Sequence, residues 1–372
     1  MTTNQNLTVA PFTVAIAQDA IDDLNRRLAN TRYAATPTGD GWQQGTPVDY
    51  LTDLVGQWQS FDWRAVEDRL NAWPQFTTEL DGQNIHFLHV RSSQTDAIPL
   101  LLVHTYPGSI LDFADLIEPL TEPADGEPAF HLVIPSLPGM GFSTPLADGD
   151  WTTARLAGAF DTLMRGLGYD SYGAHGSDGG ALVSRELAKL NPAGFLGAHA
   201  LQLFSFPSGD PAEFESLTPA DYSALEFMQW FTTVNGYADL NGKRPLTIAA
   251  ALSDSPVGQL AYHELFANFG NGTSLVSAEQ ILAQASLQWL TNTSAGVARF
   301  HYTERNAEPG VNEGPIGIAV FADDFRSIKT FAQRDNTNIV SWTEHPRGGH
   351  FAAMEVPDEL AAALRIFFAS RV

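Results

Sequence analysis

The chain has 372 residues, more than one ordinary domain core needs, and its content of 44% hydrophobic and 17% charged residues is that of a globular protein. Its 43 acidic and 20 basic residues give a formal charge of −23, so nucleic acids and anionic membranes are not expected as partners. The absence of cysteine excludes disulfides, thiolate catalysis and cysteine-ligated metal sites.

The N-terminal part, residues 1–75, is expected to wrap around a larger body. Its first residues lack the basic and apolar pattern of a signal peptide, and no apolar run in the chain reaches the roughly 20 residues that span a bilayer. We therefore expect a soluble, cytoplasmic protein, and the sequence is compatible with a homodimer. Residues 11–32 repeat apolar side chains from Ile16 to Leu28 at helical spacing, and residues 50–58 predict a second helix.

A different pattern begins at residue 76, where short apolar strands alternate with helical stretches. Helices are predicted over 151–167 and 180–190. Such alternation is typical of a mostly parallel sheet with helices on both faces, so we expect an α/β-hydrolase fold built from residues 76–205 and 305–372. The predicted strands are 85–90, 99–103, 130–135, 197–202, 316–321 and 338–342.

Residues 206–304 interrupt this alternation with a long, mostly helical and aromatic stretch. An insertion of this length between two strands of a sheet predicts a helical lid domain. Most of its aromatic side chains are expected to form the core of that lid. We take Trp230 and Phe231 as candidate substrate-binding residues.

The first motif with chemical meaning lies at residues 176–180, where glycines at both ends flank Asp178. A sharp turn from a strand into a helix tolerates only small residues around its central side chain, which it exposes above the sheet. The following helix N-terminus favours the ionised form of that carboxylate. Asp178 is therefore the candidate nucleophile. The alternative nucleophile is Ser177, but the serine-hydrolase motif would require glycine at position 175, and this residue is His175.

The second motif is the loop 104–109, directly after the strand 99–103, at the sheet edge where such folds bind ligands. The backbone N–H groups of Tyr106 and Gly179 are candidates for an oxyanion hole. Pro107 is a candidate for a cis peptide bond that orients the Tyr106 N–H. His104 and Pro107 are also candidate substrate-binding residues.

The third motif places His350 after two glycines and the last predicted strand. In hydrolases of this kind the nucleophile, the acid and the histidine follow one another in chain order. The acid is then expected after the strand 316–321, where Asp323 and Asp324 are neighbours. We choose Asp324, with Asp323 as the alternative.

Together these motifs resemble the microsomal-type (juvenile-hormone-type) epoxide hydrolases in their bacterial soluble form. The resemblance covers nearly the whole chain, including the segments 135–143, 236–245, 251–262 and 347–357. It implies that Asp178 is the nucleophile, His350 the base and Asp324 the acid. It also implies that Tyr237 donates a hydrogen bond to the epoxide oxygen.

Three features depart from the family pattern. Gly179 stands where a tryptophan usually follows the nucleophile, which is expected to enlarge or reshape the pocket floor. The segment His104-Thr105-Tyr106 replaces the usual His-Gly-Trp. The second lid tyrosine is replaced by His301, with Tyr302 next to it, so either side chain is a candidate for that role.

The expected reaction converts an epoxide and water to a vicinal diol through an ester on Asp178, without a metal or an organic cofactor. A haloalkane dehalogenase also uses an aspartate nucleophile, but it needs a donor such as an indole N–H for the halide, and Gly179 offers none. A non-catalytic binding protein of the same fold is a further alternative. The complete set of Asp178, Asp324 and His350 argues against it.

Overall fold

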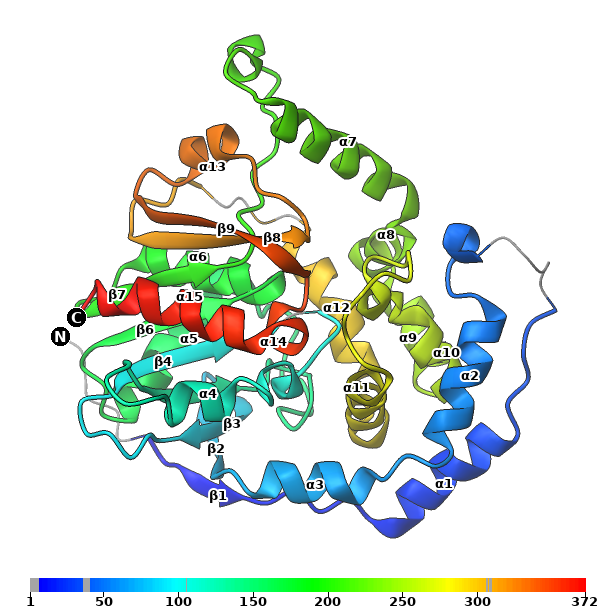
Figure 1. Ribbon diagram of the computed structural model, residues 1–372. Coiled ribbons are helices and arrows are strands. Elements are labelled where there is room, and N and C mark those ends of the chain that lie inside the picture. Colours follow the sequence, from blue (N-terminus) through cyan, green and yellow to red (C-terminus); the bar gives the residue numbers. More distant parts are fainter. Residues whose placement is uncertain (1–6, 36–40, 105, 306, 308–309) are drawn as a thin grey trace.

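The computed structural model describes residues 7–35, 41–104, 106–305, 307 and 310–372, and Thr105 lies outside the described residues. A single sheet forms the centre of the molecule, with helices on both of its faces (Figure 1). Within the described residues the sheet has nine strands. These are β1 (Ala10–Phe12), β2 (Gln75–Leu80), β3 (Gln83–Val90), β4 (Ile98–Val103), β5 (Phe130–Pro135), β6 (Tyr172–Gly176), β7 (Phe195–Ala200), β8 (Ile316–Asp323) and β9 (Ile339–Gly349).

The strands lie in the order β1-β2-β3-β5-β4-β6-β7-β8-β9. Pairing is antiparallel from β1 to β5 and parallel from β5 through β4 to β9. The inner parallel strands β4 and β5 are largely apolar and almost wholly buried because both of their faces are covered, whereas the edge strand β9 carries polar and exposed residues. The α/β-hydrolase fold expected from the sequence is confirmed. Two predicted strands need correction: β7 ends at Ala200 rather than at 202, and β9 continues to Gly349 rather than ending at 342.

Helices cover both faces of the parallel part. Figure 1 shows α15 (Pro357–Ala369), α4 (Ile117–Thr121) and the short α14 (Ala352–Glu355) in front of the strands. Behind them lie α5 (Thr153–Gly166) and α6 (Gly179–Leu190), which pack against each other. The short α13 (Lys329–Asp335) connects β8 to β9. Because helices cover both faces of the sheet, a ligand can reach the sheet only at the ends of its strands.

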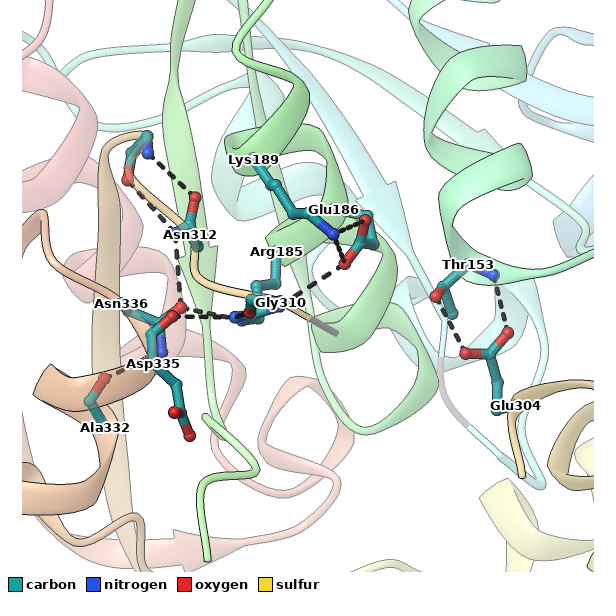
Figure 2. A network of polar contacts seen from close by, with 11 residues as sticks. Thr153, Arg185, Glu186, Lys189, Glu304, Gly310, Asn312, Ala332, Asp335 and Asn336 are labelled. Atoms are coloured by element: carbon teal, nitrogen blue, oxygen red, sulfur yellow. Dashed lines mark hydrogen bonds and ion pairs between the residues drawn. The ribbon is translucent and has the colours of Figure 1, made fainter. Parts of the chain in front are cut away.

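A buried arginine anchors helix α6, the helix that follows the candidate nucleophile. The Arg185 guanidinium donates through Nε to Asn336 Oδ1 at 2.9 Å and through Nη2 to the carbonyl oxygens of Gly310 at 2.6 Å and Asp335 at 2.9 Å (Figure 2). A buried guanidinium needs such acceptors, because an unpaired buried charge is costly. Arg185 thus fixes α6 to the segments on either side of β8.

The N-terminal segment wraps around one end of the molecule, as expected. Its helices α1 (Gln18–Ala29), α2 (Val48–Trp58) and α3 (Trp63–Asn71) follow one another along the lower and outer side in Figure 1. Asp62 caps α3 by accepting from the N–H groups of Arg64 and Ala65. The helix expected over 11–32 is shorter than predicted: residues 10–12 pair with β2, and Ile16 precedes the first helical residue.

The segment between β7 and β8 is helical, and Figure 1 shows most of it beyond the C-terminal ends of the parallel strands, with α7 running as an arch beside it. Proline or polar capping residues start several of these helices, as in the capping box of Thr218 and Asp221. Among the described residues, none of the helices combines the length and the apolarity required to cross a membrane. The helices are α7 (Pro219–Val234), α8 (Gly236–Lys243), α9 (Pro245–Leu252), α10 (Pro256–Tyr262), α11 (Ala278–Thr291) and α12 (Ser294–Glu304).

Candidate active site

A strained turn joins β6 to α6 and presents Asp178. This residue has φ +46° and ψ −116°, a backbone conformation that residues other than glycine rarely adopt. The turn requires glycine on both sides: a Cβ on Gly176 would lie 2.3 Å from the Gly180 backbone, and one on Gly180 would lie 2.0 Å from the Val103 carbonyl oxygen. Strain of this kind persists where the surrounding structure enforces it, and it is common at functional sites.

The neighbouring Ser177 lies elsewhere. It lines a small space beside His175, Leu201 and Phe351. Asp178, in contrast, accepts a hydrogen bond at Oδ2 from the Tyr106 backbone N–H at 3.2 Å. The turn therefore offers the aspartate, rather than the serine, to the loop that follows β4.

That loop contains a cis peptide bond between Tyr106 and Pro107. Its N–H at Tyr106 points at the carboxylate of Asp178, as an oxyanion-hole donor must. Gly179 is the first residue of α6, so its N–H has no acceptor within the helix. The Tyr106 N–H thus contacts the carboxylate, and the oxyanion-hole role of the Gly179 N–H stays a prediction.

The predicted acid and histidine meet in the interior. His350 Nδ1 lies 2.8 Å from Asp324 Oδ1, and both side chains are buried. Asp323 is exposed, which excludes it as the partner. Asp324 Oδ1 also accepts from the Phe325 N–H at 2.6 Å. His350 Nε2 is buried without a hydrogen-bond partner among the described residues, which leaves it for a water or a substrate group.

The electrostatics of His350 follow from this contact. Burial alone would lower the pKa of the imidazole, but the adjacent Asp324 carboxylate, assisted by the charges of Asp178 and Glu355, raises that pKa to about 9. The neighbouring carboxylates therefore favour the protonated form of the imidazole at neutral pH.

Three aromatic side chains of the insertion and the loop form a stack above Asp178. The rings of Tyr106 and Tyr237 are parallel, with centroids 5.4 Å apart, and His301 meets them edge-on at 4.6 and 5.7 Å. Burial and the charge of Asp178 raise the pKa of the Tyr237 hydroxyl well above its usual value, so it keeps its proton. Burial also lowers the pKa of His301, against the opposing pull of Asp178.

A polar chain ties the insertion to the same loop. Asn241, on α8, donates through Nδ2 to the Tyr106 hydroxyl at 3.1 Å and accepts from the Tyr262 hydroxyl at 2.8 Å. Tyr262 also donates to the Tyr237 carbonyl oxygen at 3.3 Å. The position of Tyr237 is thus coupled to the candidate oxyanion-hole loop.

The far end of the helix that carries His301 is fixed to the core. Glu304, the last residue of α12, accepts from the backbone N–H of Thr153 at 2.7 Å and from its hydroxyl at 3.0 Å (Figure 2). Thr153 is the first residue of α5, where free N–H groups attract a carboxylate. This contact restrains α12 three residues beyond His301.

Several predicted residues are placed away from the stack or serve the framework. Trp230 is 39% exposed and packs on Phe227, so the structure does not bring it to Asp178. Phe231 contacts Phe269, whose ring lies 5.1 Å from His350. The Arg305 guanidinium lies over the Tyr302 ring, with its Cζ 3.4 Å from the ring centre. His301, rather than Tyr302, therefore joins the stack.

Two further predicted binding residues support the loop from below. His104 is buried, and its Nε2 accepts from the Leu137 backbone N–H at 3.1 Å. The Pro107 carbonyl oxygen accepts from the side-chain amide of Gln288. These contacts hold the loop in place, and the substrate-binding role of both residues stays a prediction.

The sequence reasoning missed Gln202. Its buried side chain accepts the Asp178 N–H at Oε1, at 2.6 Å, and donates from Nε2 to Asp324 Oδ2. The pattern predicts a strand over 197–202 that ends on Gln202, whereas β7 ends at Ala200 and leaves this side chain in the loop beyond the strand. Its only signal was a polar residue at the end of an apolar run.

Comparisons with known proteins agree with this geometry. Residues 9–113 match the family described as "Epoxide hydrolase N terminus", and residues 98–306 match the family "alpha/beta hydrolase fold". A "Putative epoxide hydrolase" of Stigmatella aurantiaca (strain DW4/3-1) is 41% identical, over 97% of this chain and 84% of that protein.

The chain belongs to the epoxide hydrolase family.

Solved structures of epoxide hydrolases have the same fold. The Aspergillus niger enzyme is 32% identical with a TM-score of 0.86, covering 99% of this chain and 97% of that chain. The juvenile hormone epoxide hydrolase of the silkworm Bombyx mori has a TM-score of 0.89 at 23% identity, covering 98% and 95%. The resemblance stated from the sequence is confirmed. The domain limits at residues 75, 205 and 304 stay predictions.

One departure from the epoxide hydrolase pattern has a structural explanation. A Cβ on Gly179 would lie 2.8 Å from Cζ of Phe300, so the Phe300 ring rests directly on the glycine. The sequence predicts that loss of the usual tryptophan enlarges or reshapes the pocket floor. Phe300, from α12, instead fills the space next to position 179, and the floor is reshaped rather than simply opened.

Proposed function

We propose that this member of the epoxide hydrolase family opens an epoxide to a vicinal diol through an ester on Asp178. The observation that supports this most directly is the convergence on one carboxylate. Tyr106 offers its N–H to Asp178, and the charge of that carboxylate acts on His350, which is paired with Asp324. Among the described residues, no other carboxylate lies on a strained turn of this kind and acts on a buried acid–histidine pair.

In the first step one Asp178 carboxylate oxygen attacks a ring carbon, and the bond from that carbon to the ring oxygen breaks. The ring oxygen becomes an alkoxide, a far stronger base than a phenolate. Tyr237, whose raised pKa keeps its proton in place, donates that proton to the developing alkoxide. His301 lies edge-on to Tyr237 and is the second group available beside the ring oxygen.

In the second step water attacks the ester carbonyl carbon. Forming the ester removes the negative charge of Asp178, which had helped to raise the pKa of His350. The imidazolium then gives its proton back to the Tyr237 phenolate, and the neutral imidazole takes a proton from the attacking water, while Asp324 holds the ring by Nδ1. When the tetrahedral intermediate collapses, its hydroxyl proton passes to the leaving alkoxide, so Asp178 is again a carboxylate and His350 is again protonated. The Tyr106 and Gly179 N–H groups receive the oxyanion, and the diol leaves with the former Asp178 oxygen.

The helices between β7 and β8 serve this chemistry as a lid. They supply Tyr237 and His301, and the buried ring stack with Tyr106 keeps bulk water from the carboxylate. Exclusion of water strengthens each electrostatic contact within the site. The identity of the epoxide, a cytoplasmic location and a homodimer stay predictions.

The proposal is tested by trapping the ester. With His350→Ala we expect an epoxide to react once and stay attached to Asp178, because ring opening does not require the base whereas hydrolysis does. Intact-protein mass spectrometry of the variant, mixed with a panel of aryl, alkyl and bulky epoxides, should show a stoichiometric increase by the mass of an epoxide. Peptide mapping should place it on Asp178.

The double variant His350→Ala with Asp178→Asn is the matched control and should remain unmodified. An adduct on another residue, or none with any epoxide that wild type hydrolyses, contradicts the mechanism.

A further inference from the structure

The amide side chain of Gln202 lies between the two halves of the proposed catalytic machinery. Gln202 follows β7 by two residues and is 1% exposed. On one side its Oε1 accepts the N–H of Asp178 at 2.6 Å. On the other its Nε2 donates to Oδ2 of Asp324. A single side chain thus contacts the nucleophile's backbone and the acid's carboxylate.

The backbone around Gln202 holds the side chain in this place. The Leu201 N–H donates to the Gly176 carbonyl oxygen at 3.3 Å, so the chain is attached to the end of β6. The Leu203 N–H donates to Ser327 Oγ at 2.8 Å, in the loop that follows Asp324. Three consecutive residues therefore bridge the loop of the nucleophile and the loop of the acid.

At the nucleophile, the contact bears on a strained conformation. Asp178 has a positive φ, which is unfavourable for a residue other than glycine and persists only where the surroundings enforce it. The Gln202 acceptor fixes the peptide group before Asp178, and the Leu182 N–H, at 3.1 Å from the Asp178 carbonyl oxygen, fixes the peptide group after it. The direction of the carboxylate depends on both peptide groups.

At the acid, the contact completes the shell of donors. Asp324 receives hydrogen bonds from His350 and the Phe325 N–H on one oxygen and from Gln202 on the other. An amide supplies this third donor without adding charge. A carboxylate at the same position would place a second negative charge beside Asp324 and stabilise the imidazolium form of His350 further.

We propose that Gln202 is a positioning residue that holds the Asp178 turn and the Asp324–His350 pair in a fixed position relative to each other. The inference rests on the proposed function. Its acceptor end serves ring opening, because it orients the nucleophile. Its donor end serves ester hydrolysis, because it holds the acid that orients the base. The two chemical steps should therefore respond separately to changes at the two ends of one side chain.

Two variants separate the two ends. Gln202→Met keeps the volume and removes both hydrogen bonds. Gln202→Glu keeps an acceptor for the Asp178 N–H but replaces the donor to Asp324 with a carboxylate. Gln75→Met is the matched control: Gln75 is also buried and bonded at both ends, to the Leu70 carbonyl oxygen and to His86, but it lies in β2.

Ester formation and decay are measured separately in single turnovers by quenched mass spectrometry, using the epoxide that alkylates wild type fastest. We expect Gln202→Met to slow ester formation roughly threefold to tenfold and ester decay roughly tenfold to a hundredfold, as the loss of a neutral and of a charge-assisted hydrogen bond predicts. Gln202→Glu should leave formation within about threefold of wild type and slow decay. The pH at which decay is half-maximal should move upward by about one unit.

Gln75→Met should change neither rate by more than about twofold, although it lowers the melting temperature. Equal slowing of both steps by both Gln202 variants, or an unchanged pH profile of decay in Gln202→Glu, overturns the positioning role. If Gln202→Met does not fold, the Gln202→Glu profile alone decides. An absence of any ester in wild type would instead overturn the proposed function, so the two failures are distinguishable.

Discussion

The strand ends and the helical insertion hold their parts of the site by different forces. At the strand ends Asp178, Asp324 and His350 are fixed by directional hydrogen bonds and by a turn in which two glycines have no substitute. In the insertion the rings of Tyr237 and His301 pack on Tyr106, and within the described residues hydrogen bonds reach the Tyr237 carbonyl oxygen and the end of the His301 helix rather than these two rings. The first arrangement permits almost no variation in residue type, whereas the second permits replacement of one ring by another.

The difference predicts which part of the chain sets the chemistry and which part sets the substrate range. Changes at the strand ends should abolish a step of the reaction. Changes in the insertion should alter rates and selectivity gradually.

Replacing the nucleophile should have the largest effect. Asp178→Asn removes the charged oxygen that attacks the ring, so we expect diol formation to fall by a factor on the order of 10⁴ or more. Ser177→Ala is the control at the neighbouring position and should keep more than about half of the activity. Steady-state assays of both purified variants decide between the two residues. Full activity of the asparagine variant together with an inactive alanine variant would support the serine instead.

Removing one hydroxyl from the lid should have an intermediate effect. Tyr237→Phe keeps the ring stack on Tyr106 but loses the proton donor, so ester formation should slow roughly a hundredfold, with little change in ester decay. Tyr302→Phe is the matched control, because this ring packs against Arg305 outside the stack. Rapid-quench measurement of ester formation is the test. Equal losses in the two variants would remove the distinction between these tyrosines.

The contact between Gly179 and Phe300 should behave as a compensating pair. Gly179→Trp drives an indole into the Phe300 ring, and overpacking of this kind costs about 1–3 kcal/mol. We expect a lower melting temperature and roughly tenfold lower activity. Adding Phe300→Ala should restore most of both losses. A double-mutant cycle on stability and activity measures this coupling. Additive effects would show that the two positions are independent.

The smallest effect concerns stability against pH. Burial lowers the pKa of His175 to about 4 and that of His263 to about 3, below the value near 6.5 of an unfolded chain. Each such histidine lowers the free energy of unfolding of the protein as pH falls below 6.5, by about 2 kcal/mol at pH 5. His350 has the opposite shift, so its contribution is complete below 6.5 and is lost as pH rises through about 9.

Denaturant unfolding at several pH values should therefore show greatest stability near neutral pH. His263→Phe should reduce the number of protons taken up on unfolding at acid pH by close to one per molecule, so stability falls less steeply there. The alkaline part of the stability profile should not change. A wild-type stability that does not fall between pH 6.5 and 5 would contradict the assignment of neutral buried histidines.

The contrast between the two regions also explains how much the sequence could predict. The Asp178 turn was predictable because its backbone conformation requires glycine at 176 and 180, and these glycines lie within two residues of Asp178 in the sequence. His350 and Asp324 were predictable because each follows a strand in the expected chain order. These signals are local, and the structure places all three residues as expected.

What could not be predicted depends on contacts between distant segments. Gln202 was missed because β7 ends two residues earlier than expected, and strand boundaries are the least certain feature of a sequence. The filling of the space at Gly179 by Phe300 depends on how α12 approaches α6, which no local pattern records. The choice of His301 over Tyr302 and the exposure of Trp230 depend on helix rotation within the insertion.

The most direct test of the central claim follows the oxygen atoms through one turnover. Excess enzyme is mixed with an epoxide in water enriched in ¹⁸O, and the diol and the Asp178 peptide are analysed by mass spectrometry. An ester on Asp178 predicts that the first diol carries no ¹⁸O from solvent and that the label appears in the Asp178 carboxylate. Label in the first diol, with an unlabelled Asp178, would mean that water attacks the epoxide directly and would contradict the account.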